Sequence, residues 1–279
     1  MAVNAGLSDA EFQKFSDIIY KHAGIFLKPE KKELLNARLS KRLRACQIPS
    51  FQKYFEFISS PGQKDLEFVH FLNAVSTNFT SFFREVSHFD YLCSSVMPSL
   101  IANDSSSGRR ELIFWSAASS SGEEPYTLAM VLDDHLAKTA VQKVRILATD
   151  ISTKVLQTAV SGVYSMEQID KVPKEFLKRY FQKGVGKSAG KVKIKKSVRE
   201  MVTFQRFNLM HDFPWRDEMD VIFCRNVMIY FDRETQQRLV QKFYQCLRAG
   251  GYLFIGHSES ISSLKHDLKQ VGATTYRKL

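Results

Sequence analysis

A short segment near the middle of the chain combines small residues with two carboxylates. Residues 116–125 read SAASSSGEEP, so that Glu123 and Glu124 stand directly before Pro125. Small residues let a ligand approach the backbone, and a proline suits the first turn of a helix. The segment is neither a GxGxxG loop nor a P-loop, and its two acids would repel a pyrophosphate. It favours a ligand that carries an amino group or a positive charge, or it is a helix start whose acids complement the helix dipole.

Asp150 ends an apolar run that lies further along the chain. A carboxylate at the end of a second strand can hydrogen-bond both hydroxyls of a ribose, as in dinucleotide-binding folds. In isolation the same residue is equally suited to cap the following helix. Together with the small-residue loop, Asp150 favours a nucleoside without a polyphosphate, and S-adenosylmethionine fits that description.

Polar groups also follow two other apolar runs. Asn208 and Leu209 could meet the edge of an adenine, although an asparagine there also suits a turn. Arg225 and Asn226 follow the run DVIFC, and Tyr230 comes soon after. A buried strand is seldom followed directly by Arg-Asn and then by an exposed tyrosine, so this pattern is unusual for a segment that only completes a core. The alternative for Tyr230 is a packed aromatic at a helix start.

Residues 77–85 read TNFTSFFRE and contain Asn78, Thr80 and Arg84. This mixture of polar side chains, phenylalanines and an arginine suits neither a core helix nor a plain linker. The segment is either part of a site or a domain junction with a surface ion pair.

The elements before this junction are predicted to be helices. Ser8 and Glu11 form a capping-box pattern, and apolar residues follow at helical spacing. No strand signal appears before residue 110. We therefore expect a helical N-terminal domain over residues 1–76 and a linker and junction over residues 77–110.

After residue 110 short apolar runs alternate with helical segments. This alternation predicts an α/β fold with a parallel sheet over residues 111–279, whose ligands bind beyond the carboxyl ends of the strands. The expected strands are 111–117, 144–149, 220–224 and 252–255, and the expected helices are 125–137, 152–160 and 233–248. Gly-rich turns and period-two alternation indicate a small antiparallel β-insertion at about 184–199, after which 201–207 rejoins the sheet.

The net charge of +11 indicates an acidic partner and is concentrated in two segments. Residues 28–53 contain eight Lys and Arg against two Glu, and residues 183–199 contain seven Lys and Arg and no acid. Charge alone does not identify the class of partner, because nucleic acids and acidic proteins both attract basic surfaces.

The start of the chain lacks the basic and apolar regions of a signal peptide, and no apolar run approaches the roughly 20 residues of a membrane span. The four cysteines lie far apart and form no CxxC pair, which is typical of reduced thiols. We expect a soluble, cytoplasmic protein with no metal site and no direct membrane insertion.

Four motifs together resemble the chemoreceptor glutamate methyltransferase family, known as CheR. They are TNFTSFFRE at 77–85, WSAASSSGEEPYT at 115–127, CRNVMIYF at 224–231 and GHSE at 256–259. The resemblance extends over nearly the whole chain, including the helical domain and the β-insertion. It departs at Ser121 and Thr127, where relatives often carry Thr and Ser, and the loop lacks the Gly-x-Gly of other methyltransferases. It implies a Rossmann-like sheet that binds S-adenosylmethionine and releases S-adenosylhomocysteine.

The resemblance also implies roles for the matching residues. Arg84 would face the methionine carboxylate of the cofactor, and Glu124, or else Glu123, would bind its ammonium group. Tyr230 would lie beside the sulfonium methyl group. The other implied cofactor contacts are Asn78 and Thr80 from the junction, Asp150 to the ribose, Asn208 and Leu209 to the adenine, and Arg225 and Asn226 on the far wall.

The implied reaction is in-line transfer of the methyl group to a glutamate oxygen of a chemoreceptor. A carboxylate is already ionised at neutral pH, so no general base is required. The enzyme must instead align the carboxylate with the methyl group. Arg84 and Tyr230 are the expected catalytic residues for this alignment.

Two alternatives belong to other classes. A nucleic-acid methyltransferase would suit the positive charge, but base N-methylation usually needs a (D/N/S)PP(Y/F) loop, where this chain has RNVMIY. A cytosine C5 enzyme needs a nucleophilic cysteine, normally after proline, whereas Cys224 follows Phe223. A noncatalytic adapter could bind S-adenosylmethionine through the same contacts without turnover. We expect no nucleic-acid partner.

The expected partner is the cytoplasmic helical bundle of a transmembrane chemoreceptor, which is rich in glutamate. A basic helix face is the candidate docking surface, formed by Arg38, Lys41, Arg42 and Arg44. In some relatives the β-insertion also binds a peptide at the receptor C-terminus by strand addition. The basic insertion here suits an acidic peptide, and a solvated hairpin is the alternative.

Overall fold

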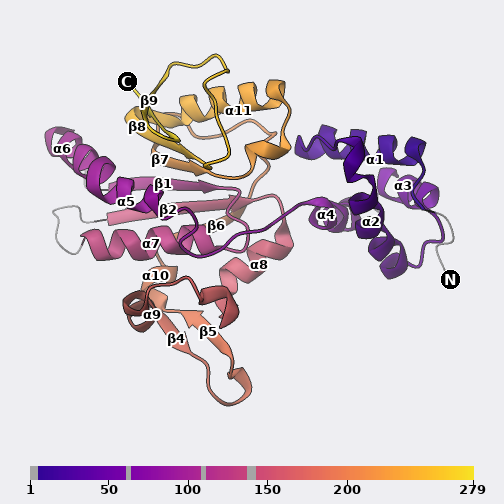
Figure 1. The fold of residues 1–279 in the computed structure, drawn as a ribbon, viewed down its shortest axis with the longest axis horizontal. Helices are drawn as coiled ribbons and strands as arrows, with labels where there is room; N and C mark the ends of the chain where they lie inside the picture. The colour runs from indigo at the N-terminus through magenta and orange to yellow at the C-terminus, as the bar shows by residue number, and fades with distance from the viewer. Residues whose placement is uncertain (1–5, 61–63, 108–110, 137–142) are drawn as a thin grey trace.

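The computed structural model describes residues 6–60, 64–107, 111–136 and 143–279. Figure 1 shows a helical domain beside a sheet domain, with a small antiparallel sheet that projects from the sheet domain. Within the described ranges, none of the helices combines the length and the apolar character that a bilayer span requires.

The N-terminal domain packs its helices around one apolar core. They are α1 (Asp9–Ala23), the 3-10 turn η1 (Pro29–Lys31), α2 (Lys32–Cys46), α3 (Phe51–Ser59) and α4 (Lys64–Val75). Ser8 caps α1 and forms the expected capping box with Glu11. Phe15, Leu39 and Tyr54 are fully buried where the apolar faces of the helices meet.

Residues 76–86 cross from the helical domain to the sheet domain, and a series of helical elements follows. These are α5 (Ser87–Tyr91), the π-helical turn η2 (Leu92–Val96) and α6 (Met97–Ser107). Phe89 and Leu92 join the core on one face of the sheet, so this series is anchored to the sheet domain.

The main sheet has the strand order β6-β2-β1-β7-β8-β10-β9. Its strands are β1 (Glu111–Ala117), β2 (Lys143–Asp150), β6 (Val202–Arg206), β7 (Met219–Cys224), β8 (Leu247–Ile255), β9 (Leu268–Gly272) and β10 (Thr275–Lys278). The first five strands of that order pair in parallel, as predicted, and β10 and β9 pair antiparallel. The sequence did not predict the β9–β10 hairpin.

Helices cover both faces of this sheet (Figure 1). They are α7 (Glu123–Leu136), α8 (Thr153–Ser161) and α11 (Arg233–Cys246). Leu128 of α7 packs into one apolar core and Phe243 of α11 into another, with the sheet between them. The predicted Rossmann-like α/β fold is therefore confirmed.

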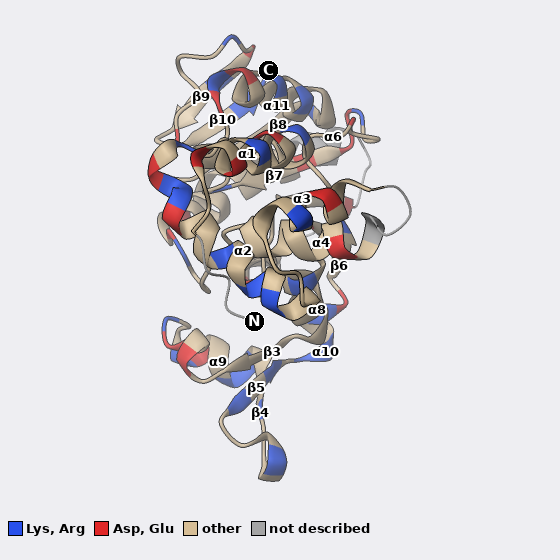
Figure 2. Cartoon of the chain, turned by 90° about the vertical axis from the view of Figure 1, so that its right-hand side faces the viewer, with Lys and Arg blue, Asp and Glu red and all other residues tan. Residues whose placement is uncertain are grey.

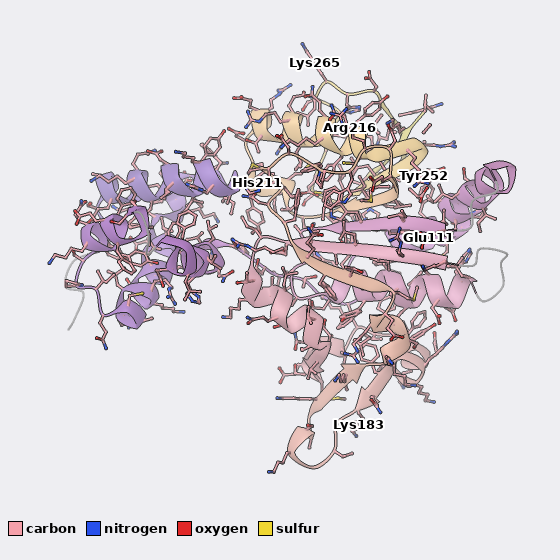
Figure 3. The ribbon with its side chains drawn as sticks, turned by 180° about the vertical axis from the view of Figure 1, so that it is seen from behind. Glu111, Lys183, His211, Arg216, Tyr252 and Lys265 are labelled. Atoms are coloured by element: carbon pink, nitrogen blue, oxygen red, sulfur yellow. The ribbon has the colours of Figure 1, made fainter. Side chains whose placement is uncertain are left out.

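The small sheet begins earlier in the chain than the segment 184–199. Its strands are β3 (Val163–Ser165), β4 (Phe181–Lys183) and β5 (Lys191–Ile194), in the antiparallel order β3-β5-β4. The elements between and after them are η3 (Glu167–Ile169), α9 (Lys174–Tyr180), η4 (Gly186–Ser188) and α10 (Lys196–Arg199). In Figure 3, Lys183 of β4 lies on this projection, whereas His211 lies beside the helical domain.

Candidate active site

A pocket opens beyond the carboxyl ends of β1, β2 and β7, where the sequence predicts a ligand site. It encloses about 990 Å³ of empty space, which includes open solvent at its mouth. Residues of the junction and of the helical domain form its other side. The sequence-predicted residues that line it are Asn78, Thr80, Arg84, Glu124, Asp150, Asn208, Leu209, Arg225, Asn226 and Tyr230.

The loop between β1 and α7 is shaped by left-handed backbone and by Asp150. Ala118 and Ser120 have φ angles of 62° and 49°, and Gly122 has a φ of 97°. Asp150 Oδ2 accepts the backbone N–H of Ser120 at 2.9 Å, and its Oδ1 accepts that of Ser152 at 2.8 Å. Burial raises the pKa of Asp150, and these hydrogen bonds oppose that rise. Asp150 therefore fixes the loop and also lines the pocket.

The two acids at the start of α7 point in different directions. Glu124 lines the pocket, and its Oε2 lies 3.0 Å from Nη1 of Arg225. Glu123 is buried outside the pocket, where it accepts the hydroxyl of Ser121 at 2.7 Å and the amide of Gln168 at 3.4 Å. Successive residues of a helix point about 100° apart, which directs the two carboxylates to different surroundings. Of the two expected acids, Glu124 is the one that lines the pocket.

Arg225 is an enclosed charge with 1% of its side chain exposed. Its Nη2 lies 2.9 Å from Oε2 of Glu85, its Nη1 binds Glu124, and Nη2 also donates to the backbone carbonyl of Arg84. Burial acts to raise the pKa of Glu85, but the charge and hydrogen bonds of Arg225 outweigh it and lower the pKa to about 2. Arg225 therefore joins the end of β7 to both α7 and the junction.

Arg84 stands between two residues with left-handed backbone. Phe83 and Glu85 have φ angles of 53° and 56°. Such residues cost free energy and persist only where their surroundings hold them. Burial of the Phe83 ring and the ion pair of Glu85 stabilise this backbone conformation. Arg84 itself donates to the carbonyl of Phe79 at 3.0 Å, and its guanidinium lies 5.5 Å from the centre of the Phe79 ring.

The junction is also tied to the loop that follows β1. The Ser120 hydroxyl donates to the backbone carbonyl of Asn78 at 2.8 Å, and the Thr127 hydroxyl accepts the N–H of Phe83 at 3.2 Å. Asn78 and Thr80 both line the pocket. These two hydrogen bonds hold the junction against the loop after β1 and against α7.

Glu259 fixes the turn that carries Tyr230, a role that sequence reasoning missed. Its buried carboxylate accepts the backbone N–H of Asn226 at 2.9 Å and that of Met228 at 2.8 Å. Met228 begins the 3-10 turn η5 (Met228–Tyr230), whose first N–H groups have no partner within the turn. The motif GHSE contains this glutamate, and that motif was the available signal.

The helical domain contacts residues of the site and of the junction. The Asn208 side-chain amide donates to the carbonyl of His22 at 2.6 Å, so this asparagine links the sheet domain to the end of α1. Arg38 of α2 donates to the carbonyl of Val75 and to the hydroxyl of Thr77, the latter at 3.0 Å. The first residues of the junction are therefore held by the helical domain.

Two family models match nearly the whole chain. They are the CheR methyltransferase all-alpha domain over residues 10–76 and the CheR methyltransferase SAM binding domain over residues 78–277. The chain belongs to the CheR methyltransferase family.

Similar proteins of this family match the chain over nearly its whole length. The chain is 40% identical over 268 residues to chemotaxis protein methyltransferase 2 of Pseudomonas aeruginosa, covering 95% of this chain and 92% of that protein. It is 39% identical over 277 residues to the chemotaxis protein methyltransferase of Escherichia coli, covering 99% and 93%. This CheR-family chain is therefore an S-adenosylmethionine-dependent methyltransferase that acts in chemotaxis.

Two of the four basic residues expected on the docking face of this CheR methyltransferase are engaged within the protein. Arg42 binds both carboxylate oxygens of Glu67, at 3.0 and 2.6 Å, and Arg38 binds the start of the junction. The other two, Lys41 and Arg44, are exposed. Figure 2 shows Lys and Arg on α2 and also on the small sheet.

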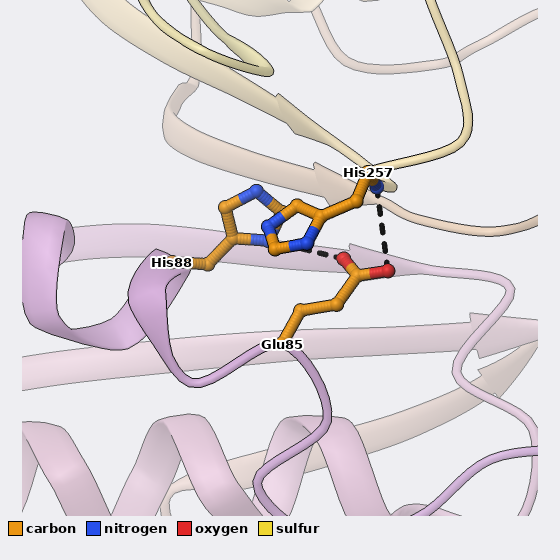
Figure 4. Close-up of side chains that lie close together, drawn as sticks. All are labelled: Glu85, His88 and His257. Carbon is orange, nitrogen blue, oxygen red and sulfur yellow. Dashed lines mark hydrogen bonds and ion pairs between the residues drawn. The ribbon is translucent and has the colours of Figure 1, made fainter.

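Glu85, His88 and His257 are the one group of possible metal ligands among the described residues (Figure 4). His88 Nδ1 lies 3.4 Å from Oε2 of Glu85, and the Glu85 Oε1 accepts the backbone N–H of His257 at 3.3 Å. Burial, with the neighbouring Arg225, lowers the pKa of His88 to about 3. Arg225 supplies a positive charge at the Glu85 carboxylate, 2.9 Å from its Oε2.

Proposed function

We propose that this CheR methyltransferase transfers the methyl group of S-adenosylmethionine to glutamate side chains of bacterial chemoreceptors, giving glutamate methyl esters. One observation carries the proposal: Arg84 of the junction and Tyr230 of η5 line the same pocket as Glu124 and Asp150. The pocket thus combines groups suited to the amino acid and ribose of the cofactor with groups suited to an incoming carboxylate.

Within this proposal Glu124 binds the cofactor ammonium and Asp150 binds the ribose hydroxyls. Both carboxylates line the pocket, and each is fixed by neighbouring hydrogen bonds. Arg84 binds the methionine carboxylate. The remaining proposed contacts are Asn78 and Thr80 from the junction, Asn208 and Leu209 at the adenine, and Arg225 and Asn226 in the wall.

The chemical step is a displacement at the methyl carbon. A glutamate oxygen forms a bond to that carbon while the carbon–sulfur bond breaks, and the bonding electrons pass to sulfur as S-adenosylhomocysteine leaves. The attacking carboxylate is ionised at neutral pH, so the step needs no general base. Arg84 and Tyr230 orient the carboxylate, and orientation of this kind lowers reaction barriers strongly.

Incubation of the protein with methyl-labelled S-adenosylmethionine and receptor-rich membranes tests the proposal. Base-labile label on receptor protein is the expected result, because carboxyl methyl esters hydrolyse in base. Label on added RNA or DNA would instead support a nucleic-acid methyltransferase. Cofactor binding without transfer to any acceptor would support a noncatalytic adapter.

The proposed partner is the glutamate-rich cytoplasmic helical bundle of a transmembrane receptor, so the proposed location is the cytoplasm. Lys41 and Arg44 on α2 offer exposed positive charge to such a bundle. A receptor C-terminal peptide is a second proposed contact, because β3 and β4 are the edge strands of the basic small sheet. Deleting residues 186–190 should abolish peptide binding and leave cofactor binding intact. Equal peptide affinity of both proteins would remove this contact.

A further inference from the structure

Three charged side chains form a line beside the pocket, and Arg225 stands in the middle. Its guanidinium lies 2.9 Å from Glu85 on one side and 3.0 Å from Glu124 on the other. Glu124 lines the pocket, whereas Glu85 does not. One carboxylate of the line thus faces the ligand and the other is hidden from it.

Each carboxylate is held by further hydrogen bonds. The Ser116 hydroxyl donates to Oε1 of Glu124 at 2.7 Å, and the Asn226 side-chain amide donates to Oε1 of Glu85 at 3.2 Å. The pKa of Glu85 is lowered to about 2, because the charge and hydrogen bonds of Arg225 outweigh its burial, so Glu85 is ionised at neutral pH. Two carboxylates and one guanidinium leave one excess negative charge whenever Glu124 is ionised.

This excess charge determines what Glu124 can bind. Without the negative charge of Glu85, Glu124 and Arg225 would form a neutral pair. A ligand ammonium group at Glu124 would then meet the attraction of one carboxylate and the repulsion of Arg225, with no excess negative charge to favour its binding.

We propose that Glu85 is a positioning residue that gives this pocket its preference for a nucleoside carrying an amino group, acting through Arg225 and Glu124. The inference rests on the proposed role of Glu124 in cofactor binding. Glu85 itself touches no ligand in this scheme.

The competing explanation is that Glu85 only holds the junction in place, as its left-handed backbone and its contact with His257 would allow. Three nucleosides distinguish the two explanations. S-adenosylhomocysteine carries an amino group and a carboxylate, its decarboxylated analogue carries the amino group alone, and 5′-methylthioadenosine carries neither. A structural defect would weaken all three, whereas a charge effect would weaken only the first two.

The experiment measures the affinity of each nucleoside for the wild type and for Glu85→Gln by titration calorimetry. The variant should bind both amino-bearing ligands about tenfold more weakly and 5′-methylthioadenosine as the wild type does. Glu67→Gln is the matched control, because Glu67 is a buried acid that is also paired with an arginine and does not line the pocket, and it should leave all three affinities unchanged.

Two results would overturn the inference: an equal loss for all three ligands, or no loss for the amino-bearing pair. If Glu85→Gln does not fold, Glu85→Asp replaces it. That variant keeps the charge and should keep the preference for the amino group, and loss of the preference would contradict the proposal. A wild type that binds no S-adenosylhomocysteine would instead remove the proposed function itself.

Discussion

The carboxylate of Glu259 accepts the backbone N–H of Met228 at 2.8 Å, two residues before Tyr230. It also accepts the N–H groups of Asn226 and Gly256, at 2.9 and 2.6 Å. One buried side chain therefore connects the end of β7, the end of β8 and the turn that presents Tyr230 to the pocket. Tyr230 depends for its position on a residue that lies outside the pocket.

Replacing Glu259 with glutamine should destabilise the protein and slow methyl transfer. The amide keeps one acceptor oxygen but turns an N–H₂ group toward backbone donors, so at least one buried donor loses its partner, at a cost of about 1–3 kcal/mol. Urea unfolding and single-turnover methyl transfer are the measurements. Unchanged values of both would show that this carboxylate does not fix the turn.

The ion pair of Glu85 with Arg225 should make stability depend on pH. The pKa of Glu85 in the folded protein is about 2, below the ordinary value of 4.5, so its contribution is present above about pH 4.5 and is lost as the pH falls toward 2. Glu85→Gln should therefore be less stable than the wild type at neutral pH, and the difference should shrink at about pH 3. Chemical denaturation of both proteins at each pH checks this. A difference that is constant with pH would contradict the assignment.

Asp150→Ala should weaken S-adenosylmethionine binding, because the ribose hydroxyls lose a charged acceptor worth about 1.5–3 kcal/mol. The N–H groups of Ser120 and Ser152 lose their acceptor as well, so the loop after β1 should loosen. Asp150→Asn is the control for shape. Titration calorimetry measures both variants, and an unchanged affinity for Asp150→Ala would remove this residue from the site.

Tyr230 and Arg84 should differ in how their replacement affects binding and turnover. Tyr230→Phe should lower kcat more than it lowers cofactor affinity, because the proposed position of Tyr230 is at the methyl group. Arg84→Ala should lower both, since its proposed partners include the methionine carboxylate. Methyl-transfer kinetics and calorimetry separate the two effects. Full turnover by Tyr230→Ala would show that the tyrosine does not align the reactants.

The exposed pair Lys41 and Arg44 should contribute to receptor docking through long-range attraction. Reversing both to glutamate should raise the apparent KM for receptor at low salt, and the defect should shrink as salt rises, because the Debye length falls to about 8 Å at physiological ionic strength. Cofactor affinity should be unchanged. Receptor methylation at the wild-type rate in low salt would show that this face does not bind the substrate.

Arg42→Ala is a matched comparison on the same helix. This arginine binds buried Glu67, which also accepts the hydroxyl of Tyr54 at 2.7 Å. Its loss should lower the free energy of unfolding rather than change the salt dependence of docking.

Short-range patterns in the sequence were sufficient to predict most of the fold. Residues close together in the sequence are enough to predict the capping box of Ser8 and Glu11 and the strand that ends at Asp150. Capping and apolar periodicity both depend on short-range spacing. The rule that ligands lie at the carboxyl ends of parallel strands then places Asp150 and Glu124 at one edge of the sheet. The sequence by itself thus determined the α/β class and the edge that carries the candidate site.

Only the tertiary structure decided which charged groups meet. Arg225 lies 140 positions from Glu85 and 101 from Glu124, and no local pattern predicts such pairs. The partner of Arg42 could not be predicted either. The sequence pattern indicated that Arg42 belongs to a basic helix face, whereas in the structure it forms an ion pair with Glu67. A buried charge must find a partner, but the packing of distant helices and strands selects which one it finds. For this reason two glutamates that both pair with Arg225 differ in position: Glu124 lines the pocket and Glu85 does not.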